Sequence, residues 1–216
     1  THLELERNQV SPDIAHFLQH LMPSYAYVSL YQKLPGTIPA LQQKDKVRVL
    51  SIDGGGIRGL LPALILKHIG DQLEKKINAQ FDFARHVDLM AGTSTGGLIS
   101  LALTMPGDRG RPKYTPQTLV DIYSTKGPEI FPAPWCCLKV LVEAQYDPKP
   151  LEASLEGLFG DTPFSASLAH TMIASFDLGH NAAHIFDSQE ARRASQYDFT
   201  IRGVGRATTA AHTFFQ

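Results

Sequence analysis

A serine set between glycines at residues 92–96, in the order Gly-Thr-Ser-Thr-Gly, is the stretch of this sequence best suited to nucleophilic chemistry. The G-x-S-x-G pattern is typical of a nucleophile elbow, in which a sharp strand-to-helix turn exposes the serine hydroxyl. Glycines such as Gly92 and Gly96 let neighbouring backbone pass close to the turn. The pattern makes Ser94 the candidate nucleophile, although a tight turn with a helix-capping serine fits the same five residues.

A second glycine-rich turn, with the sequence DGGGIRG, follows a β-branched apolar segment that starts at Val47. Acyl transfer requires donors for the oxyanion of the tetrahedral intermediate, each worth about 3 kcal/mol. The backbone N–H groups of Gly54, Gly55 and Gly56 are candidates for these donors. Arg58 adds positive charge beside them, and it fits either an ion pair that supports the loop or a contact with an anionic head group.

The same turn also matches the dinucleotide-binding pattern G-x-G-x-x-G at Gly54, Gly56 and Gly59. That pattern requires an acidic residue at the end of a second strand, about 20 residues further on. Glu74 has this spacing, but it lies in a predicted helix with no strand before it. The sequence therefore favours an oxyanion site over a nucleotide site, and we expect no cofactor.

Strands alternate with helices around the two turns. Apolar periodicity predicts strands at 47–53, 86–91, 171–176 and 184–186, and helices at 60–77, 98–105, 118–125 and 151–159. This alternation is typical of an α/β fold with a mainly parallel sheet that helices cover on both faces. The two turns then follow neighbouring strands of one sheet.

Composition narrows the class of protein further. The formal net charge of -1 excludes a strongly basic nucleic-acid binder. No apolar run approaches the roughly 18 residues of a membrane-spanning helix. The two cysteines, Cys136 and Cys137, are neighbours, which excludes a disulfide framework and a cysteine-based metal site. We expect a cytoplasmic protein, peripheral at membranes, with secretion left open.

The chain of 216 residues is predicted to hold one catalytic domain, at 46–216, after an N-terminal extension at 1–45. Ser11 followed by Pro12 predicts the start of a short amphipathic helix in the extension, and 35–45 is a polar linker. Because the chain begins with Thr1 rather than Met, we expect a processed or trimmed piece.

The two turns together resemble the patatin-like phospholipase family. DGGGIRG is similar to the family's oxyanion box and GTSTGG to its nucleophile box; weaker similarity covers 124–131, 146–151, 174–186 and 206–215. The resemblance implies a three-layer α/β/α fold and a Ser–Asp dyad without histidine or metal. Ser94 would be acylated by a lipid and then released by water, with Gly54, Gly55, Gly56 and Arg58 in the oxyanion region.

The dyad aspartate of the family lies in an Asp-Gly-Gly or Asp-Gly-Ala box downstream of the segment that 206–215 resembles. The chain ends at Gln216 without such a box, so we expect a fragment or a natural truncation that lacks the catalytic base and the end of the fold. A Ser-Asp-His triad is an alternative, because Asp177 or Asp187 followed by His212 has the chain order of α/β-hydrolases.

The expected function is a lipid acyl hydrolase of the phospholipase A or lysophospholipase type. Its substrate would be a phospholipid or lysophospholipid, reached by transient contact with a membrane surface. Apolar residues at 131–141 are candidates for lipid contact, although core packing fits them as well. The alternative from another class is a catalytically incomplete lipid-binding or interaction module.

Overall fold

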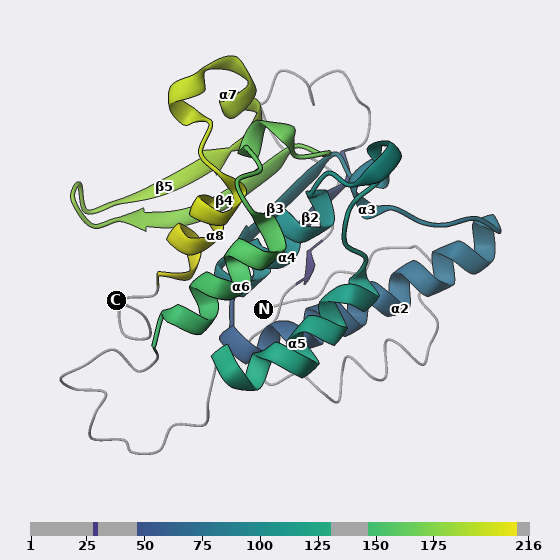
Figure 1. The fold of residues 1–216 in the computed structure, drawn as a ribbon. Coiled ribbons are helices and arrows are strands. Elements are labelled where there is room, and N and C mark those ends of the chain that lie inside the picture. The colour runs from purple at the N-terminus through teal and green to yellow at the C-terminus, as the bar shows by residue number, and fades with distance from the viewer. Residues whose placement is uncertain (1–27, 30–46, 131–146, 211–216) are drawn as a thin grey trace.

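A computed structural model describes residues 28–29, 47–130 and 147–210 of the chain. A five-stranded sheet crosses its centre in the order β1-β2-β3-β4-β5 (Figure 1). The strands are β1 (Val28–Ser29), β2 (Val49–Ile52), β3 (Leu89–Thr93), β4 (Thr171–Asp177) and β5 (Ala182–Asp187). Strands β2, β3 and β4 are parallel, whereas β1 and β5 pair antiparallel at the two edges.

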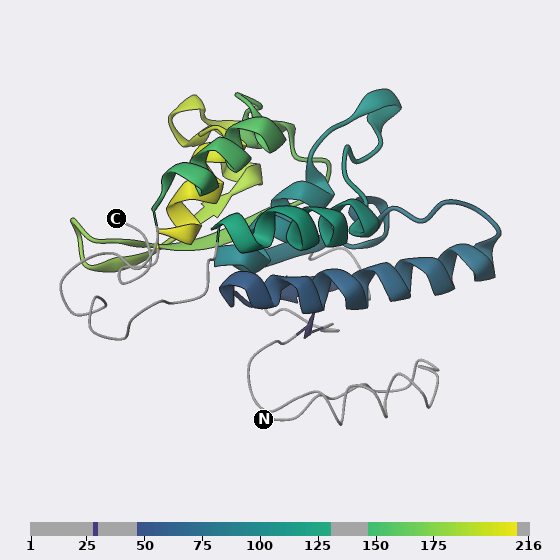
Figure 2. The same ribbon diagram turned by 60° about the horizontal axis from the view of Figure 1, so that its bottom comes forward.

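Helices pack against this sheet and against one another. They are α2 (Leu60–Ile77), α3 (Phe83–His86), α4 (Ser94–Thr104), α5 (Pro116–Ile130), α6 (Lys149–Phe159), α7 (Ser188–Arg193) and α8 (Ile201–Thr209). Helix α4 packs on the three parallel strands, and α8 packs on α4 and β4. Helix α6 contacts α8, while α2 and α5 lie side by side (Figures 1 and 2). The predicted α/β fold with a parallel centre is confirmed.

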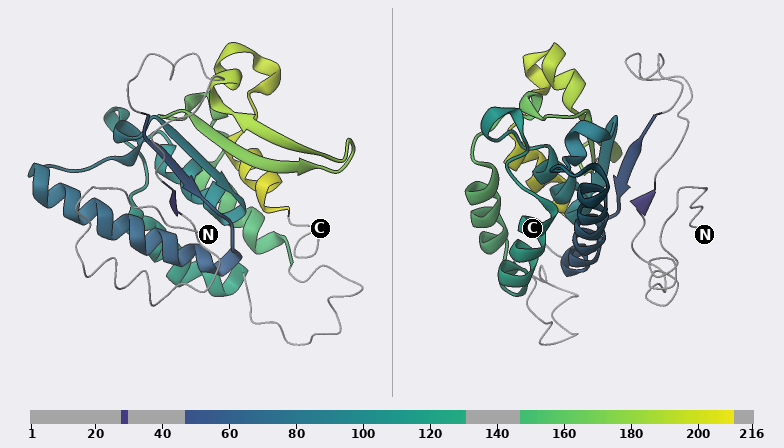
Figure 3. Two further views of the ribbon diagram at one scale, coloured as in Figure 1. Left: turned by 180° about the vertical axis from the view of Figure 1, so that it is seen from behind. Right: turned by 90° about the vertical axis from the view of Figure 1, so that its right-hand side faces the viewer.

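Both faces of the sheet are apolar, as expected for buried parallel strands. Leu50, Met90 and Ile173 lie in the main core beneath α4 and α8. Successive side chains of a strand point to opposite faces, and Val49 and Leu89 accordingly belong to a second, smaller cluster. Figure 3 shows the sheet edge-on with α4, α5 and α6 on one side of it.

Most predicted elements are present, with two corrections around the elbow. Helix α2 has the predicted bounds, 60–77, with Pro62 tolerated in its first turn. The strand predicted at 86–91 instead runs from Leu89 to Thr93, because residues 83–86 form one helical turn. Helix α4 begins at Ser94, four residues before the predicted start, since its two glycines are helical rather than part of a loop.

The last strand pair departs from the expected alternation of strands and helices. Only four residues separate β4 from β5, and six residue pairs join the two strands as an antiparallel hairpin. A parallel crossover needs a dozen or more residues, so this short connection requires the antiparallel pairing.

Part of the predicted N-terminal extension joins the sheet, because Val28 pairs with Ile52 and Ser29 with Ser51. The domain boundary near residue 45 stays a prediction. The helix expected after Pro12, the linker at 35–45, the lipid-contact candidate at 131–141 and His212 lie outside the described residues. Of the helices that the structure describes, none has the length and apolarity needed to cross a bilayer.

Candidate active site

Ser94 lies at the sharp junction between β3 and α4. Strand β3 ends at Thr93, and Ser94 is the first residue of α4, with a φ of 50°. A left-handed backbone costs a residue with a side chain about 1–3 kcal/mol, and such strain is concentrated at functional sites. The turn therefore has the strained strand-to-helix geometry of a nucleophile elbow.

The glycines on either side of Ser94 are required by the close approach of neighbouring backbone. A Cβ atom on Gly92 would lie 2.5 Å from the carbonyl oxygen of Gly96. A Cβ atom on Gly96 would lie 2.6 Å from the carbonyl oxygen of Asp53 and closer still to that of Ile52. The first turn of α4 thus presses on the end of β2, which brings the second glycine-rich turn beside the elbow.

Gly54, in the glycine loop, lies directly against Ser94. The register pairs Ile52 with Gly92, so two residues later Gly54 is level with Ser94. A Cβ atom on Gly54 would lie 2.7 Å from the Ser94 Cβ. The Gly54 N–H donates to Thr93 Oγ1 at 3.1 Å, and the neighbouring Gly55 N–H donates to Thr95 Oγ1 at 3.1 Å.

Because of these two hydrogen bonds, two of the three predicted oxyanion donors already have an acceptor. Gly54 and Gly55 would have to release a threonine hydroxyl before donating to an oxyanion. The Gly56 N–H has no acceptor within the described residues, and Gly56 has a φ of 58° that favours glycine. The Thr95 N–H is a further candidate, because N–H groups in the first turn of a helix lack an acceptor within that helix.

Arg58 lies on the outer side of the glycine loop. It belongs to a short 3-10 helix, Gly56–Gly59, that leads directly into α2. Its N–H donates to the Gly55 carbonyl at 3.1 Å and closes the turn, and its side chain is exposed. The backbone of Arg58 therefore shapes the loop, and the two roles considered for its guanidinium stay open.

Thr208 supports the elbow from the last turn of α8, and sequence reasoning missed it. The Ser94 N–H donates to Thr208 Oγ1 at 2.8 Å, and the same hydroxyl donates to the Ala174 carbonyl on β4 at 2.6 Å. Thr208 is 114 residues from Ser94 in the chain, so no local motif connects the two. The only sequence feature that pointed to Thr208 is its place in the segment 206–215, which resembles the family.

We expect Thr208→Val to lower the turnover of Ser94-dependent hydrolysis. Valine leaves the Ser94 N–H without its acceptor, and an unsatisfied buried donor costs about 1–3 kcal/mol. If the elbow then relaxes, kcat should fall about tenfold with KM little changed, and Thr208→Ser should restore it. The matched control is Thr209→Val, because the Thr209 hydroxyl donates to the Gly205 carbonyl of its own helix. Equal losses in both valine variants would contradict this positioning role.

Tyr123 on α5 contacts both glycine-rich turns, at Thr95 and at Gly59. Its hydroxyl donates to the Thr95 carbonyl at 3.4 Å, and a Cβ atom on Gly59 would collide with its ring. Burial raises the pKa of the Tyr123 hydroxyl well above its ordinary value. Tyr123 therefore stays protonated at neutral pH and supports the loop rather than exchanging a proton.

Asp187, a member of the alternative triad, lies at the end of the parallel strands opposite to Ser94. It pairs with Met172 near the start of β4, whereas Ser94 follows the carboxyl end of β3. Its carboxylate accepts from His170 Nε2 at 2.9 Å and from the Gln189 N–H at 2.7 Å. Burial alone would raise the pKa of Asp187, but these hydrogen bonds outweigh it and lower the pKa.

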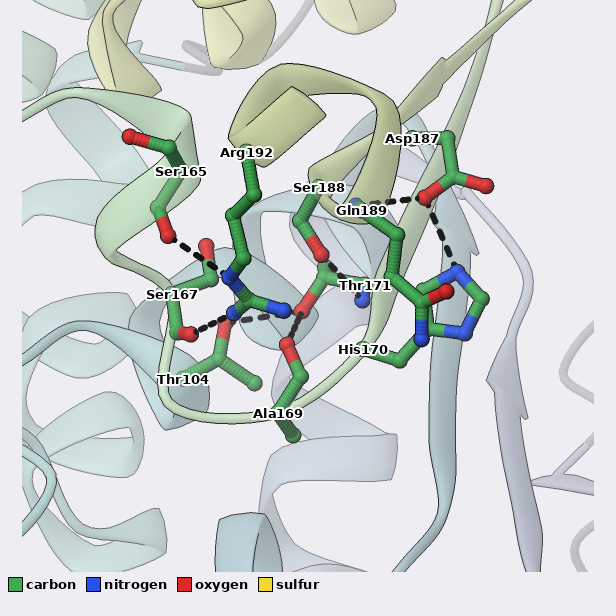
Figure 4. Close-up of polar contacts among 10 residues, drawn as sticks. All are labelled: Thr104, Ser165, Ser167, Ala169, His170, Thr171, Asp187, Ser188, Gln189 and Arg192. Atoms are coloured by element: carbon green, nitrogen blue, oxygen red, sulfur yellow. Dashed lines mark hydrogen bonds and ion pairs between the residues drawn. The ribbon is translucent and has the colours of Figure 1, made fainter. Parts of the chain in front are cut away.

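The polar cluster around Asp187 joins β4, β5 and α7. The Ser188 hydroxyl accepts from the Thr171 N–H at 2.9 Å, and Arg192 donates to the carbonyls of Ser165 and Ser167 (Figure 4). Asp177, the other triad candidate, bonds His180 at 2.6 Å in the exposed β4–β5 turn. Both carboxylates thus have histidine partners among the described residues. His212 lies outside those residues, so the triad stays an untested alternative.

The nucleotide alternative also lacks its acidic residue. Glu74 lies inside α2, and its carboxylate accepts from the Phe81 N–H at 3.0 Å. It is therefore not at the end of β3, where a ribose would require it. Within the described part of the chain, no three His, Cys, Asp or Glu side chains gather as metal ligands.

Comparison with known proteins agrees with this fold. A family profile for patatin-like phospholipases matches residues 50–216. The chain is 38% identical over 175 residues to "Patatin-like protein 2" of Arabidopsis thaliana, covering 78% of this chain and 43% of that protein. It is 35% identical over 175 residues to "Patatin-17" of Solanum cardiophyllum, covering 81% and 44%.

The chain belongs to the patatin-like phospholipase family, which confirms the resemblance found in its sequence. A third relative, "Probable inactive patatin-3-Kuras 1" of Solanum tuberosum, is 35% identical over 173 residues, which cover 79% of this chain and 45% of that protein. The chain therefore spans less than half the length of these relatives.

Proposed function

We propose that this chain carries the nucleophile and oxyanion parts of a serine lipid acyl hydrolase, of the phospholipase A or lysophospholipase type. One observation carries the proposal: Ser94, with a left-handed φ of 50°, lies directly against the glycine loop at Gly54. A strained serine at the carboxyl end of a parallel strand is well placed to meet a substrate outside the sheet.

In the proposed reaction, the Ser94 oxygen attacks the carbonyl carbon of an acyl ester. A new oxygen–carbon bond forms, and the tetrahedral intermediate holds its negative charge on the former carbonyl oxygen. The bond to the alcohol then breaks, and the alcohol leaves with the proton first taken from Ser94. Water attacks the acyl-serine in the same way and releases the fatty acid, which restores the Ser94 hydroxyl.

Backbone N–H groups stabilise the oxyanion in this scheme. Those of Gly56 and Thr95 are the most direct donors, and those of Gly54 and Gly55 can act once they exchange their threonine acceptors. The base that moves the serine proton is the aspartate that the family resemblance implies, on an Asp-Gly box downstream of the 206–215 segment. This proton transfer contributes about 10²–10⁴-fold to the rate.

The proposed substrates are phospholipids or lysophospholipids at a membrane surface. Of the two roles considered for the exposed Arg58, contact with an anionic head group fits these substrates. A non-catalytic, lipid-binding module is the second candidate, because one relative bears a name that calls it probably inactive.

A fluorophosphonate probe distinguishes the two candidates. We expect protein expressed from its complete reading frame to release fatty acid from phosphatidylcholine vesicles. Mass spectrometry should find the probe on Ser94. An adduct on a different serine would contradict the assignment. Vesicle binding without an adduct and without fatty acid release would favour the non-catalytic module.

A further inference from the structure

The chain has one pair of adjacent arginines, Arg192 and Arg193, which stand three and two residues before Ser195 in the sequence Arg-Arg-Ala-Ser. The arginines are the last two residues of α7, and Ser195 begins the short 3-10 helix that follows. Protein kinases that prefer basic substrates select serines by this arrangement of charge, because carboxylates of the kinase pair with the arginines. The chemistry proposed for Ser94 leaves this pattern unexplained.

Ser195 lies where another protein can reach it. The residue is exposed, and its hydroxyl makes no hydrogen bond with the described residues. Arg193 is also exposed and has no hydrogen-bond or ion-pair partner among them. Ala194, between the two, has extended backbone, so the chain has left the helix before the serine. Figure 1 shows α7 projecting from the top of the molecule.

Four other hydroxyl residues follow a lysine or arginine by two or three positions, and they are less suited to modification. Ser51 lies inside β2, and Thr208 and Thr209 are buried in α8. The Thr115 hydroxyl is bonded to a residue in the first turn of α5. Ser195 is therefore the hydroxyl of this group that a kinase can both recognise and reach.

Ser195 also lines a polar hollow that has room for a phosphate group. The hollow has a volume of about 390 Å³, and both arginines line it together with Ser165. Arg192 donates from two of its nitrogens to the carbonyls of Ser165 and Ser167 (Figure 4). Because a guanidinium has five N–H donors, Arg192 keeps others for a new acceptor.

We propose that Ser195 is a phosphorylation site for a kinase that prefers basic substrates, and that Arg192 and Arg193 then bind the phosphate. In the transfer, the Ser195 oxygen attacks the γ-phosphorus of a nucleoside triphosphate. The bond from that phosphorus to the oxygen bridging it to the β-phosphorus breaks, and nucleoside diphosphate leaves. A carboxylate of the kinase takes the hydroxyl proton.

The phosphate then loosens the contact between α7 and the turn at Ser165. It adds a charge of about −1.5 to −2 and three acceptor oxygens. Because charge-assisted hydrogen bonds are about twice as strong as neutral ones, the phosphate draws Arg192 away from its two carbonyl acceptors. The phosphate also repels Asp198, which lines the hollow and whose carboxylate accepts from the Ser165 N–H and hydroxyl.

The first experiment measures transfer of phosphate from ATP to the folded protein, expressed in bacteria from its complete reading frame. The enzyme is the catalytic subunit of cyclic-AMP-dependent protein kinase, and mass spectrometry should find the phosphate on Ser195. Arg193→Ala should lower kcat/KM for the transfer at least tenfold, because it removes a charge-assisted hydrogen bond to the kinase.

The matched control is Arg109→Ala, which removes an exposed arginine that no serine or threonine follows at this spacing. It should leave the transfer unchanged. Phosphate only on other residues, or equal transfer to Ser195 in Arg193→Ala, would overturn the proposal.

Hydrogen exchange tests the second half of the proposal without relying on recognition by the kinase. In protein phosphorylated at Ser195, backbone amides at 163–167 and 189–194 should exchange about tenfold faster than in the unmodified protein, and phosphatase should reverse the change. Amides of β3 should exchange as before. Unchanged exchange at 163–167 would refute the withdrawal of Arg192. Neither measurement depends on Ser94, so the hydrolase assignment stands or falls separately.

Discussion

Ser94→Ala is expected to abolish covalent labelling by fluorophosphonate and to lower ester hydrolysis by about 10⁵-fold. Alanine removes the oxygen that forms the acyl-enzyme, and neither the base nor the oxyanion donors can replace it. The fold should persist, because the Ser94 backbone makes the bond to Thr208 and the side chain is only partly buried. The measurement is the rate of release of p-nitrophenol, together with the unfolding midpoint.

Two control variants test whether the loss of activity is specific to Ser94. Ser195→Ala changes an exposed serine in a short 3-10 helix after α7 and should retain full activity. Asp187→Asn should lower stability more than turnover, because its carboxylate bonds His170 and caps α7. Substantial hydrolysis in Ser94→Ala would refute the assignment of the nucleophile. Loss of turnover in a stable Asp187→Asn protein would favour the triad hypothesis.

Gly96→Ala is expected to have the largest effect on stability. Its Cβ would meet the carbonyl oxygens of Ile52 and Asp53, which are backbone atoms at the end of β2 and cannot rotate away. Forcing a methyl group into such a site costs about 3 kcal/mol, a large part of the 5–15 kcal/mol that holds a typical domain together. To relieve this clash, α4 would have to shift away from β2, and the shift would also move Ser94 away from the glycine loop.

The control for Gly96 is a glycine that has room. Gly157 is exposed on α6, and a Cβ there would meet nothing within 4 Å. Gly157→Ala should stabilise the protein by about 0.5–1 kcal/mol, because alanine loses less backbone entropy on folding. Urea denaturation measures both changes. A Gly96→Ala protein as stable and active as the wild type would show that the close contact between α4 and β2 is not required.

The sequence by itself determined the elements whose signal is local. Helix α2 was predicted at its observed bounds, because its apolar face repeats at helical spacing and Pro62 is tolerated only in a first turn. The two glycine-rich turns were recognised for a similar reason, since each is a short, continuous pattern after an apolar strand. The start of α4 was misplaced because Gly96 and Gly97 suggest a loop until their close packing is known.

Tertiary structure alone decided how the site is held together. The sequence named Gly54 and Gly55 as oxyanion donors, but only the fold shows that their N–H groups meet the hydroxyls of Thr93 and Thr95. Thr208 reaches the Ser94 N–H across 114 residues, and no local pattern carries that information. Strand register and helix packing bring such groups together, and these depend on the whole core rather than on any one segment.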